Sequence, residues 1–268
     1  MGKSSVVLLL AIAASLLAGG TAHAAPASSP ALPAYPVKNA STLTRNALYA
    51  TGRLPATSCP EHPVRAGSAA SVRSYLLPLV KCLDATWKAQ FAKARLPFTP
   101  PKVRFITRPE KACGEKWGKN VQAIYCNPTR QIVMLLDRAV VSSPEDLFLM
   151  DVIAHEYGHH VQNVTGMWRE LGRLPSRGKA EYYEQTRRHE LQAECLAGAF
   201  IGSVWQSLDR TDEDWDDLLD IDRRSGDEQS KVRDHGKGRN IANWLNRGYK
   251  AAGPSACNTW IASSTMVA

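Results

Sequence analysis

The chain has 268 residues, of which 44% are hydrophobic and 22% are charged, and this is an ordinary globular composition. Its 33 lysine and arginine residues exceed its 25 aspartate and glutamate residues, which gives a formal net charge of +8. The basic residues are scattered and form no compact run interleaved with aromatic residues. We therefore expect weak association with an anionic cell envelope and no nucleic-acid binding.

The N-terminus has the layout of a secretory signal peptide. Lys3 precedes an apolar run over 6–17, and the small residues Ala22 and Ala24 flank His23 as they do at a cleavage site. The run is too short to stay in a bilayer as a helix, and no later segment is long and apolar enough to do so. We therefore predict cleavage after Ala24, secretion, and no stable membrane insertion once the signal is removed.

The chain is predicted to have three parts. The signal peptide covers 1–24. A stretch rich in alanine, proline and serine follows, and it cannot bury enough apolar surface to offset the entropy of ordering it. We therefore expect a flexible leader over 25–50 and one folded domain over 51–268.

All six cysteines lie after the predicted cleavage site, and an even number in an exported chain favours disulfides. None forms a C-x-x-C pair, which counts against a cysteine-based zinc site and against a thioredoxin-like redox centre. The spacing alone leaves the pairing open. The cysteines are Cys59, Cys82, Cys113, Cys126, Cys195 and Cys257.

Hydrophobic periodicity predicts a helix over 69–94. Short runs rich in β-branched residues predict strands at 103–106 and 131–136, and the stretch 113–126 between them is expected to be a loop or hairpin. The acidic stretch 212–222 has apolar residues at helical spacing, so we interpret it as a solvated helix face.

A further helix is predicted over 144–164, with Ser143 as its N-cap. Within it, His155 and His159 are four residues apart, so both imidazoles project from one face and can bind the same ion. Glu156 is expected to lie beside that ion, where a carboxylate can take a proton from an attacking water. The H-E-x-x-H pattern thus indicates a zinc site, and the competing interpretation is two hydrogen-bonded helix histidines without a metal.

A third protein ligand must come from elsewhere, because two histidines and a water leave tetrahedral zinc one ligand short. The next helical segment, about 176–207, places Glu190 and Glu194 on one face. One of them can bind zinc while the other holds a ligand imidazole, although a pair of surface carboxylates is the commoner case. His189 is the rival ligand, and His160 is interpreted either as a packing residue or as a residue that supports a ligand.

These segments resemble the putative neutral zinc metallopeptidase family of bacteria. Three blocks carry the resemblance, and they lie at 155–162, at 190–198, and between Asp234-His235-Gly236 and Thr259. The resemblance spans roughly 106–259, and three ordered blocks are far more specific than one motif.

The resemblance implies an α+β fold of the zincin type, in which a small mixed sheet borders the cleft with an edge strand and two helices supply the metal site. It implies that His155, His159 and Glu190 are the ligands of one catalytic Zn²⁺ ion. Glu156 is then the general base. The resemblance also gives His235 a role in stabilising the oxyanion or donating a proton.

The resemblance further implies that Glu194 holds the imidazole of His155 by a hydrogen bond. The family usually has aspartate at this position, and the longer glutamate is the one departure from the pattern. The implied disulfides are Cys195 with Cys257 and Cys113 with Cys126, which leaves Cys59 to pair with Cys82.

We therefore expect a secreted zinc-dependent endopeptidase whose partner is a peptide or protein substrate, bound in extended form along an edge strand around 132–136. The alternative is a non-catalytic exported module in which zinc only joins two helices and the chain binds the envelope. Such a module has no need of Glu156, so the presence of this residue favours the enzyme.

Overall fold

The structure is a computed structural model that describes residues 35, 37–119 and 121–268. The predicted signal peptide, its cleavage site and the leader up to residue 34 lie outside the described residues. In the described part of the chain, no helix is long and apolar enough to cross a membrane.

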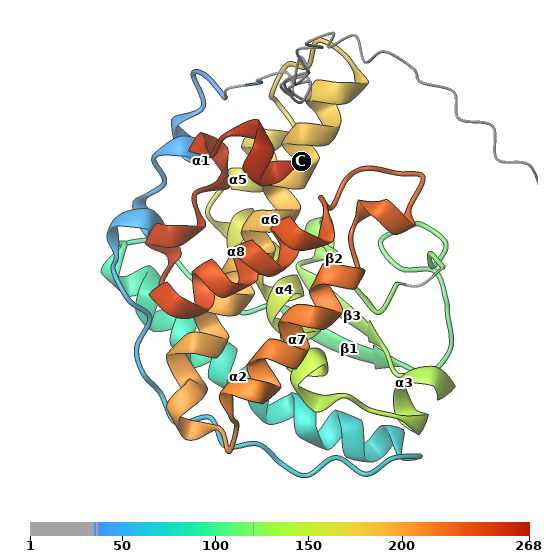
Figure 1. The fold of residues 1–268 in the computed structure, drawn as a ribbon. Coiled ribbons are helices and arrows are strands. Elements are labelled where there is room, and N and C mark those ends of the chain that lie inside the picture. Colours follow the sequence, from blue (N-terminus) through green and yellow to red (C-terminus); the bar gives the residue numbers. More distant parts are fainter. Residues whose placement is uncertain (1–34, 36, 120) are drawn as a thin grey trace, which may run out of the picture. The chain divides into compact units, whose positions relative to one another are not determined.

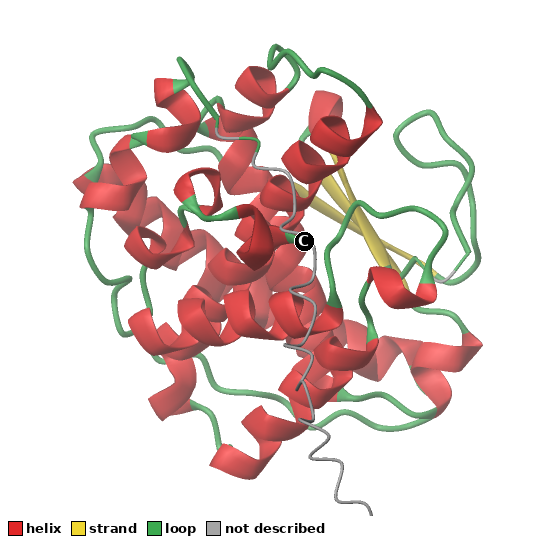
Figure 2. Ribbon diagram, turned by 45° about the horizontal axis from the view of Figure 1, so that its top comes forward, coloured by secondary structure: helices red, strands yellow, loops and turns green. Residues whose placement is uncertain are grey.

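Helices make up most of the domain, and they lie mainly to one side of a small sheet (Figures 1 and 2). The long helices are α2 (Ala69–Lys93), α4 (Asp146–Val164), α6 (Lys179–Val204), α7 (Asp212–Arg224) and α8 (Gly238–Ala251). The short ones are α1 (Ser41–Thr44), α3 (Arg138–Ser142) and α5 (Met167–Leu171). Single 3-10 turns occur at Ala47–Ala50, Asn127–Thr129, Trp205–Ser207, Asp227–Gln229, Pro254–Cys257, Thr259–Ile261 and Ser264–Val267. This is a mixed α+β fold, as expected.

The sheet has three strands in the order β1-β3-β2. Strand β3 (Gln131–Leu135) pairs in parallel with β1 (Lys102–Ile106) and antiparallel with β2 (Ala123–Cys126), so the sheet is mixed. The predicted substrate strand at 132–136 is therefore wrong, because β3 is central and both of its edges are already paired. Strand β2 is an edge strand, with no other described strand on its outer side.

The central position of β3 follows from its sequence. Positions 132–135 are all buried, which is typical of a strand covered on both faces. An edge strand with one solvated face would alternate apolar and polar residues instead. The missing alternation was therefore a signal for a central strand.

The folded domain begins before residue 51. The leader was expected to reach residue 50, but α1 and the turn Ala47–Ala50 are ordered helical segments. Leu43 and Leu48 are fully buried, and the Asn46 side chain accepts a hydrogen bond from the Leu48 amide. Burial of these two leucines offsets the entropy of ordering a segment that composition alone marks as a leader.

Three disulfides fix the long connections, and their pairing is the one that the resemblance implies. They are Cys59–Cys82, Cys113–Cys126 and Cys195–Cys257. The last of these ties the middle of α6 to the C-terminal segment. The second closes the loop that leads into β2.

Candidate metal centre

Helix α4 carries the H-E-x-x-H motif, and it begins later than the sequence suggested. Its N-cap is Glu145, and Ser143 instead ends the short helix α3. The reason is local: the Asp137 side chain accepts from the Val140 amide and starts α3, so the helical residues before Pro144 belong to another element. The predicted cap at Ser143 is therefore wrong. The motif still lies in the second half of one continuous helix.

Helices α4 and α6 bring three candidate ligands to one point. The Nε2 atoms of His155 and His159 are 3.2 Å apart. Glu190 Oε2 lies 3.5 Å from His155 Nε2 and 3.0 Å from His159 Nε2. Nitrogens bound to one tetrahedral zinc ion at about 2.0–2.1 Å are about 3.3 Å from each other, so this spacing fits zinc. Three protein donors leave a fourth position open, as in catalytic rather than structural zinc sites.

The far side of each imidazole is held by a hydrogen bond. His155 Nδ1 is 2.8 Å from Glu194 Oε2, and His159 Nδ1 is 2.8 Å from Gln162 Oε1. Acceptors at both Nδ1 atoms favour the tautomers that leave each Nε2 free to bind a cation. Glu194 thus reaches His155 even though its side chain is longer than the family's usual aspartate. The role of Gln162 was missed, although its spacing of three residues from His159 on one helix was visible.

The electrostatics of the three donors match a cation site. Burial alone would lower the pKa of His155, but hydrogen bonds to Glu190 and Glu194 raise that pKa well above its usual value. For Glu190, burial favours a higher pKa, and the neighbouring His159 and His155 reverse this and hold the pKa well below its usual value. The carboxylate of Glu190 therefore lies against the imidazole of His155, which attracts a proton. A divalent cation at this point would supply the same positive charge that the proton supplies.

Glu156 is 8% exposed and lines the same cleft as the three candidate ligands. Burial raises the pKa of its carboxyl, and the nearby His159 and His155 partly oppose this rise. A carboxylate with a raised pKa is a better proton acceptor near neutral pH. Its place in the same cleft as the three candidate ligands therefore suits proton transfer.

His235 lies at the rim of the site on the connection between α7 and α8. Its Nε2 is 3.8 Å from Glu190 Oε2, and its Nδ1 is 2.7 Å from Asp234 Oδ1. Burial lowers the pKa of His235, but Glu190 and Asp234 outweigh it, so the pKa is raised. The connection is fixed by Asp227, which accepts from the backbone amides of His235 and Gly236. Sequence reasoning gave Asp227 no role.

The rival ligand His189 lies outside the group of donors. Its ring stacks on His159 at 4.9 Å and packs against Trp168, and burial lowers its pKa to about 3. It is therefore a neutral residue behind the site. His160 is also a packing residue, as predicted: it is fully buried, with Nδ1 3.0 Å from Tyr125 Oη and Nε2 2.7 Å from the Thr99 carbonyl oxygen.

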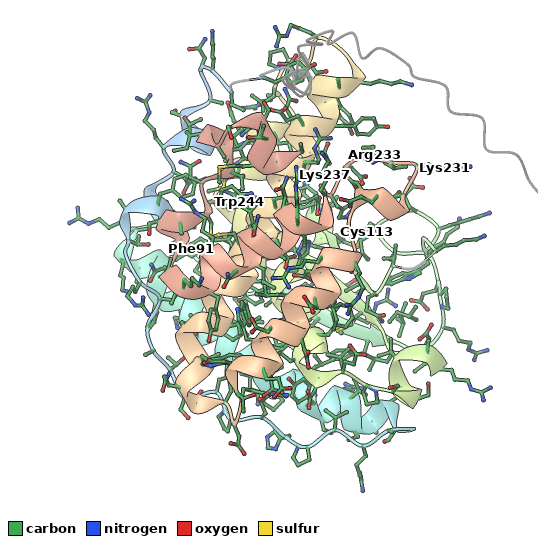
Figure 3. The ribbon with its side chains drawn as sticks, viewed as in Figure 1. Phe91, Cys113, Lys231, Arg233, Lys237 and Trp244 are labelled. Atoms are coloured by element: carbon green, nitrogen blue, oxygen red, sulfur yellow. A yellow bond between two sulfur atoms is a disulfide. The ribbon has the colours of Figure 1, made fainter. Side chains whose placement is uncertain are left out.

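A cleft of about 440 Å³ opens beside the donors. One wall comes from β2 and the loop before it, and the opposite side comes from α4, α6 and His235. Figure 3 shows Cys113 of that loop and the basic residues Lys231 and Arg233 of the α7–α8 connection on the same side of the ribbon. The cleft therefore lies between the edge strand β2 and the three candidate ligands.

An α+β fold with a His-His-Glu donor set and an adjacent glutamate defines a class of candidate zinc hydrolases. The chain belongs to the Putative neutral zinc metallopeptidase family, whose model matches residues 57–260. It is similar to the uncharacterized protein YpfJ of Escherichia coli K12, with 30% identity over 198 residues that cover 66% of this chain and 67% of the relative. It is also similar to the uncharacterized protein Rv2575 of Mycobacterium tuberculosis H37Rv, with 31% identity over 132 residues that cover 42% of this chain and 44% of the relative. No solved structure matches the chain.

Proposed function

We propose that this protein is a secreted zinc-dependent endopeptidase with a zincin-type active site. The observation that carries the proposal is the convergence of His155, His159 and Glu190, with Glu156 in the same cleft. One catalytic Zn²⁺ ion, when bound by these three residues, supplies the Lewis acidity that polarises the scissile carbonyl and the attacking water.

The chain's own residues then move the protons and hold the ligands. Glu156 takes the proton of the attacking water and passes it to the leaving amine. His235, with its raised pKa, donates a hydrogen bond to the oxyanion as it forms. Glu194 and Gln162 keep the two imidazoles in the binding tautomer.

The substrate is a peptide or protein segment bound in extended form. Strand β2 offers its outer edge beside the cleft, so we place the substrate there and no longer on 132–136. The cleft wall near β2 contains Val121, Ile124 and Trp168, which suit an apolar side chain next to the cleaved bond.

The decisive variant is Glu156→Gln, because it keeps the size of the side chain but cannot take a proton. We expect zinc content and the unfolding transition to stay as in the wild type. Cleavage in a diverse peptide library should fall by about 10² to 10⁴, the usual contribution of a positioned acid-base group. The matched control is the exposed Glu213→Gln, which should cleave at the wild-type rate.

Two results would contradict the proposal in different ways. A zinc-loaded wild type that cleaves nothing in the library would exclude the endopeptidase. The alternative would then remain, a non-catalytic exported module in which zinc only joins two helices. Equal cleavage by Glu156→Gln keeps the enzyme but removes Glu156 as the base. Secretion is tested separately by N-terminal sequencing of the exported protein, which should begin at Ala25.

A further inference from the structure

A second cluster of carboxylates lies behind the metal centre, where three helices meet. Asp151 comes from α4, Glu194 from α6 and Asp222 from α7, and one oxygen of each lies within 4.8 Å of the others. The three residues are only 4%, 6% and 4% exposed. The acidic stretch 212–222 was expected to form a solvated helix face, and for Asp222 this expectation is wrong.

One oxygen of each carboxylate in the cluster lacks a hydrogen-bond partner. Asp151 Oδ1, Glu194 Oε1 and Asp222 Oδ2 are buried and have no partner among the described residues. Burial, together with the charge of Glu194, raises the pKa of both aspartates well above their usual values. Buried ionised carboxylates without a partner are unfavourable, so the ionised cluster calls for a positive charge.

We propose that Asp151, Glu194 and Asp222 form a second cation site, distinct from the zinc centre and suited to Ca²⁺. All of its donors are carboxylate oxygens, which favour hard cations over zinc. Two oxygens bound to one calcium ion at 2.3–2.6 Å can be up to about 5 Å apart, and the 4.8 Å limit satisfies this. Mg²⁺ fits less well, because it keeps several waters and the cluster is nearly closed to solvent.

The number of oxygens also agrees with calcium. Three carboxylates carry six oxygens, and Glu194 Oε2 is occupied by His155, so at least three and at most five are free for the cation. Calcium takes six to eight oxygen ligands, so one or more waters complete the shell. The charge then falls from −3 to −1, and this residual charge faces the imidazole of His155.

Glu194 joins the two sites. Its Oε2 is hydrogen-bonded to His155, and its Oε1 is the unpaired oxygen of the cluster. A cation at the cluster would therefore hold Glu194 in the position that orients His155. Calcium should tighten zinc binding as a consequence, although the calcium site itself does not depend on peptidase activity.

The test is isothermal titration of CaCl₂ into the full, zinc-loaded chain, with thermal unfolding as a second readout. We expect one calcium ion per chain and a rise in Tm of about 5 °C or more at saturating calcium. Asp222→Asn should weaken calcium binding about tenfold or more, because it removes one of three charged ligands. The matched control is Asp217→Asn, an exposed position on the same helix with the same change in charge, and it should bind calcium as the wild type does.

Three results would overturn the site. One is no calcium binding and no rise in Tm for the wild type, and another is equal calcium affinity in Asp222→Asn and the wild type. The third concerns protons, because Asp222 can donate a hydrogen bond to Glu194 only when its own carboxyl group is protonated. If calcium has no effect and the wild type loses more stability than Asp222→Asn as pH rises, the carboxyl groups share protons and bind no cation.

Zinc content and peptide cleavage are measured separately, so loss of the proposed peptidase activity would leave the calcium result standing. Asp151→Asn serves as the second variant if Asp222→Asn does not fold.

Discussion

The close approach of α4 and α6 at Gly158 positions the three candidate ligands relative to one another, and Gly158→Ala tests this by adding one methyl group. A Cβ at Gly158 would lie 2.8 Å from the carbonyl oxygen of Ala193 and 2.9 Å from its Cα. Ordinary contacts begin at 3.4 Å, so Gly158→Ala must push the two helix backbones apart by about 0.6 Å. The contact partner is backbone and cannot swing away.

The expected magnitude follows from that displacement. Overpacking of this kind typically costs about 1–3 kcal/mol, and the gain in helix propensity from glycine to alanine offsets about 1 kcal/mol of it. We therefore expect a net destabilisation of about 0–2 kcal/mol, so the zinc affinity is the more sensitive readout. The histidines lie on α4 and Glu190 lies on α6, so moving the two helices apart changes the distances between these ligands. The displacement of about 0.6 Å exceeds the roughly 0.2 Å tolerance of ligand distances in a metal site. Zinc affinity should fall about tenfold or more.

Zinc affinity is measured by competition with a chelator, and stability by denaturant unfolding of the zinc-free chain. The control is Gly172→Ala at the end of α5, where a Cβ would meet its nearest atoms at 3.6 and 3.8 Å. This variant should bind zinc normally. If Gly158→Ala matched the wild type in both measurements, the close contact at Ala193 would not be what positions Glu190.

Three further predictions concern residues around the site. Glu194→Ala should lower zinc affinity about 10- to 100-fold in the same chelator assay, because His155 loses its hydrogen-bond partner, and Glu194→Asp should recover part of it. Replacing Cys195 and Cys257 together by serine should lower the free energy of unfolding by about 2–4 kcal/mol, and an unchanged denaturation midpoint would contradict this. Burial lowers the pKa of His160 to about 4 in the folded protein, whereas its pKa in the unfolded chain is about 6.5. The stability contributed by neutral His160 is therefore complete above pH 6.5 and is lost as pH falls through 4, because the unfolded chain binds the proton first. The wild type should lose about 3 kcal/mol of unfolding free energy over this pH range, and His160→Gln should lack this loss. The free energy of unfolding is measured by denaturant unfolding at each pH.

Four of the five long helices and two of the strands were predicted from the sequence, but α8 (Gly238–Ala251) was not, and the arrangement of the elements was only partly predicted. The predicted helices at 69–94 and 176–207 correspond to α2 and α6, and the strand at 103–106 corresponds to β1. Strand β2 was not predicted as a separate strand within the expected loop or hairpin at 113–126. It has only four residues and ends at a disulfide-bonded cysteine, so its hydrophobic periodicity is too short to recognise. Its edge position depends on strand order, which no local pattern encodes.

The sequence by itself determined the features that follow from one helix. A spacing of four residues places His155 and His159 on the same face, and Glu156 must then lie beside them. Only the tertiary structure decided between Glu190 and His189 as the third donor, because that choice depends on how α6 is rotated against α4. The burial of Asp222 next to Asp151 and Glu194 was decided in the same way. Residues on three separate helices come within 4.8 Å only through packing, and the local periodicity of α7 could not reveal which of its acidic residues would be enclosed.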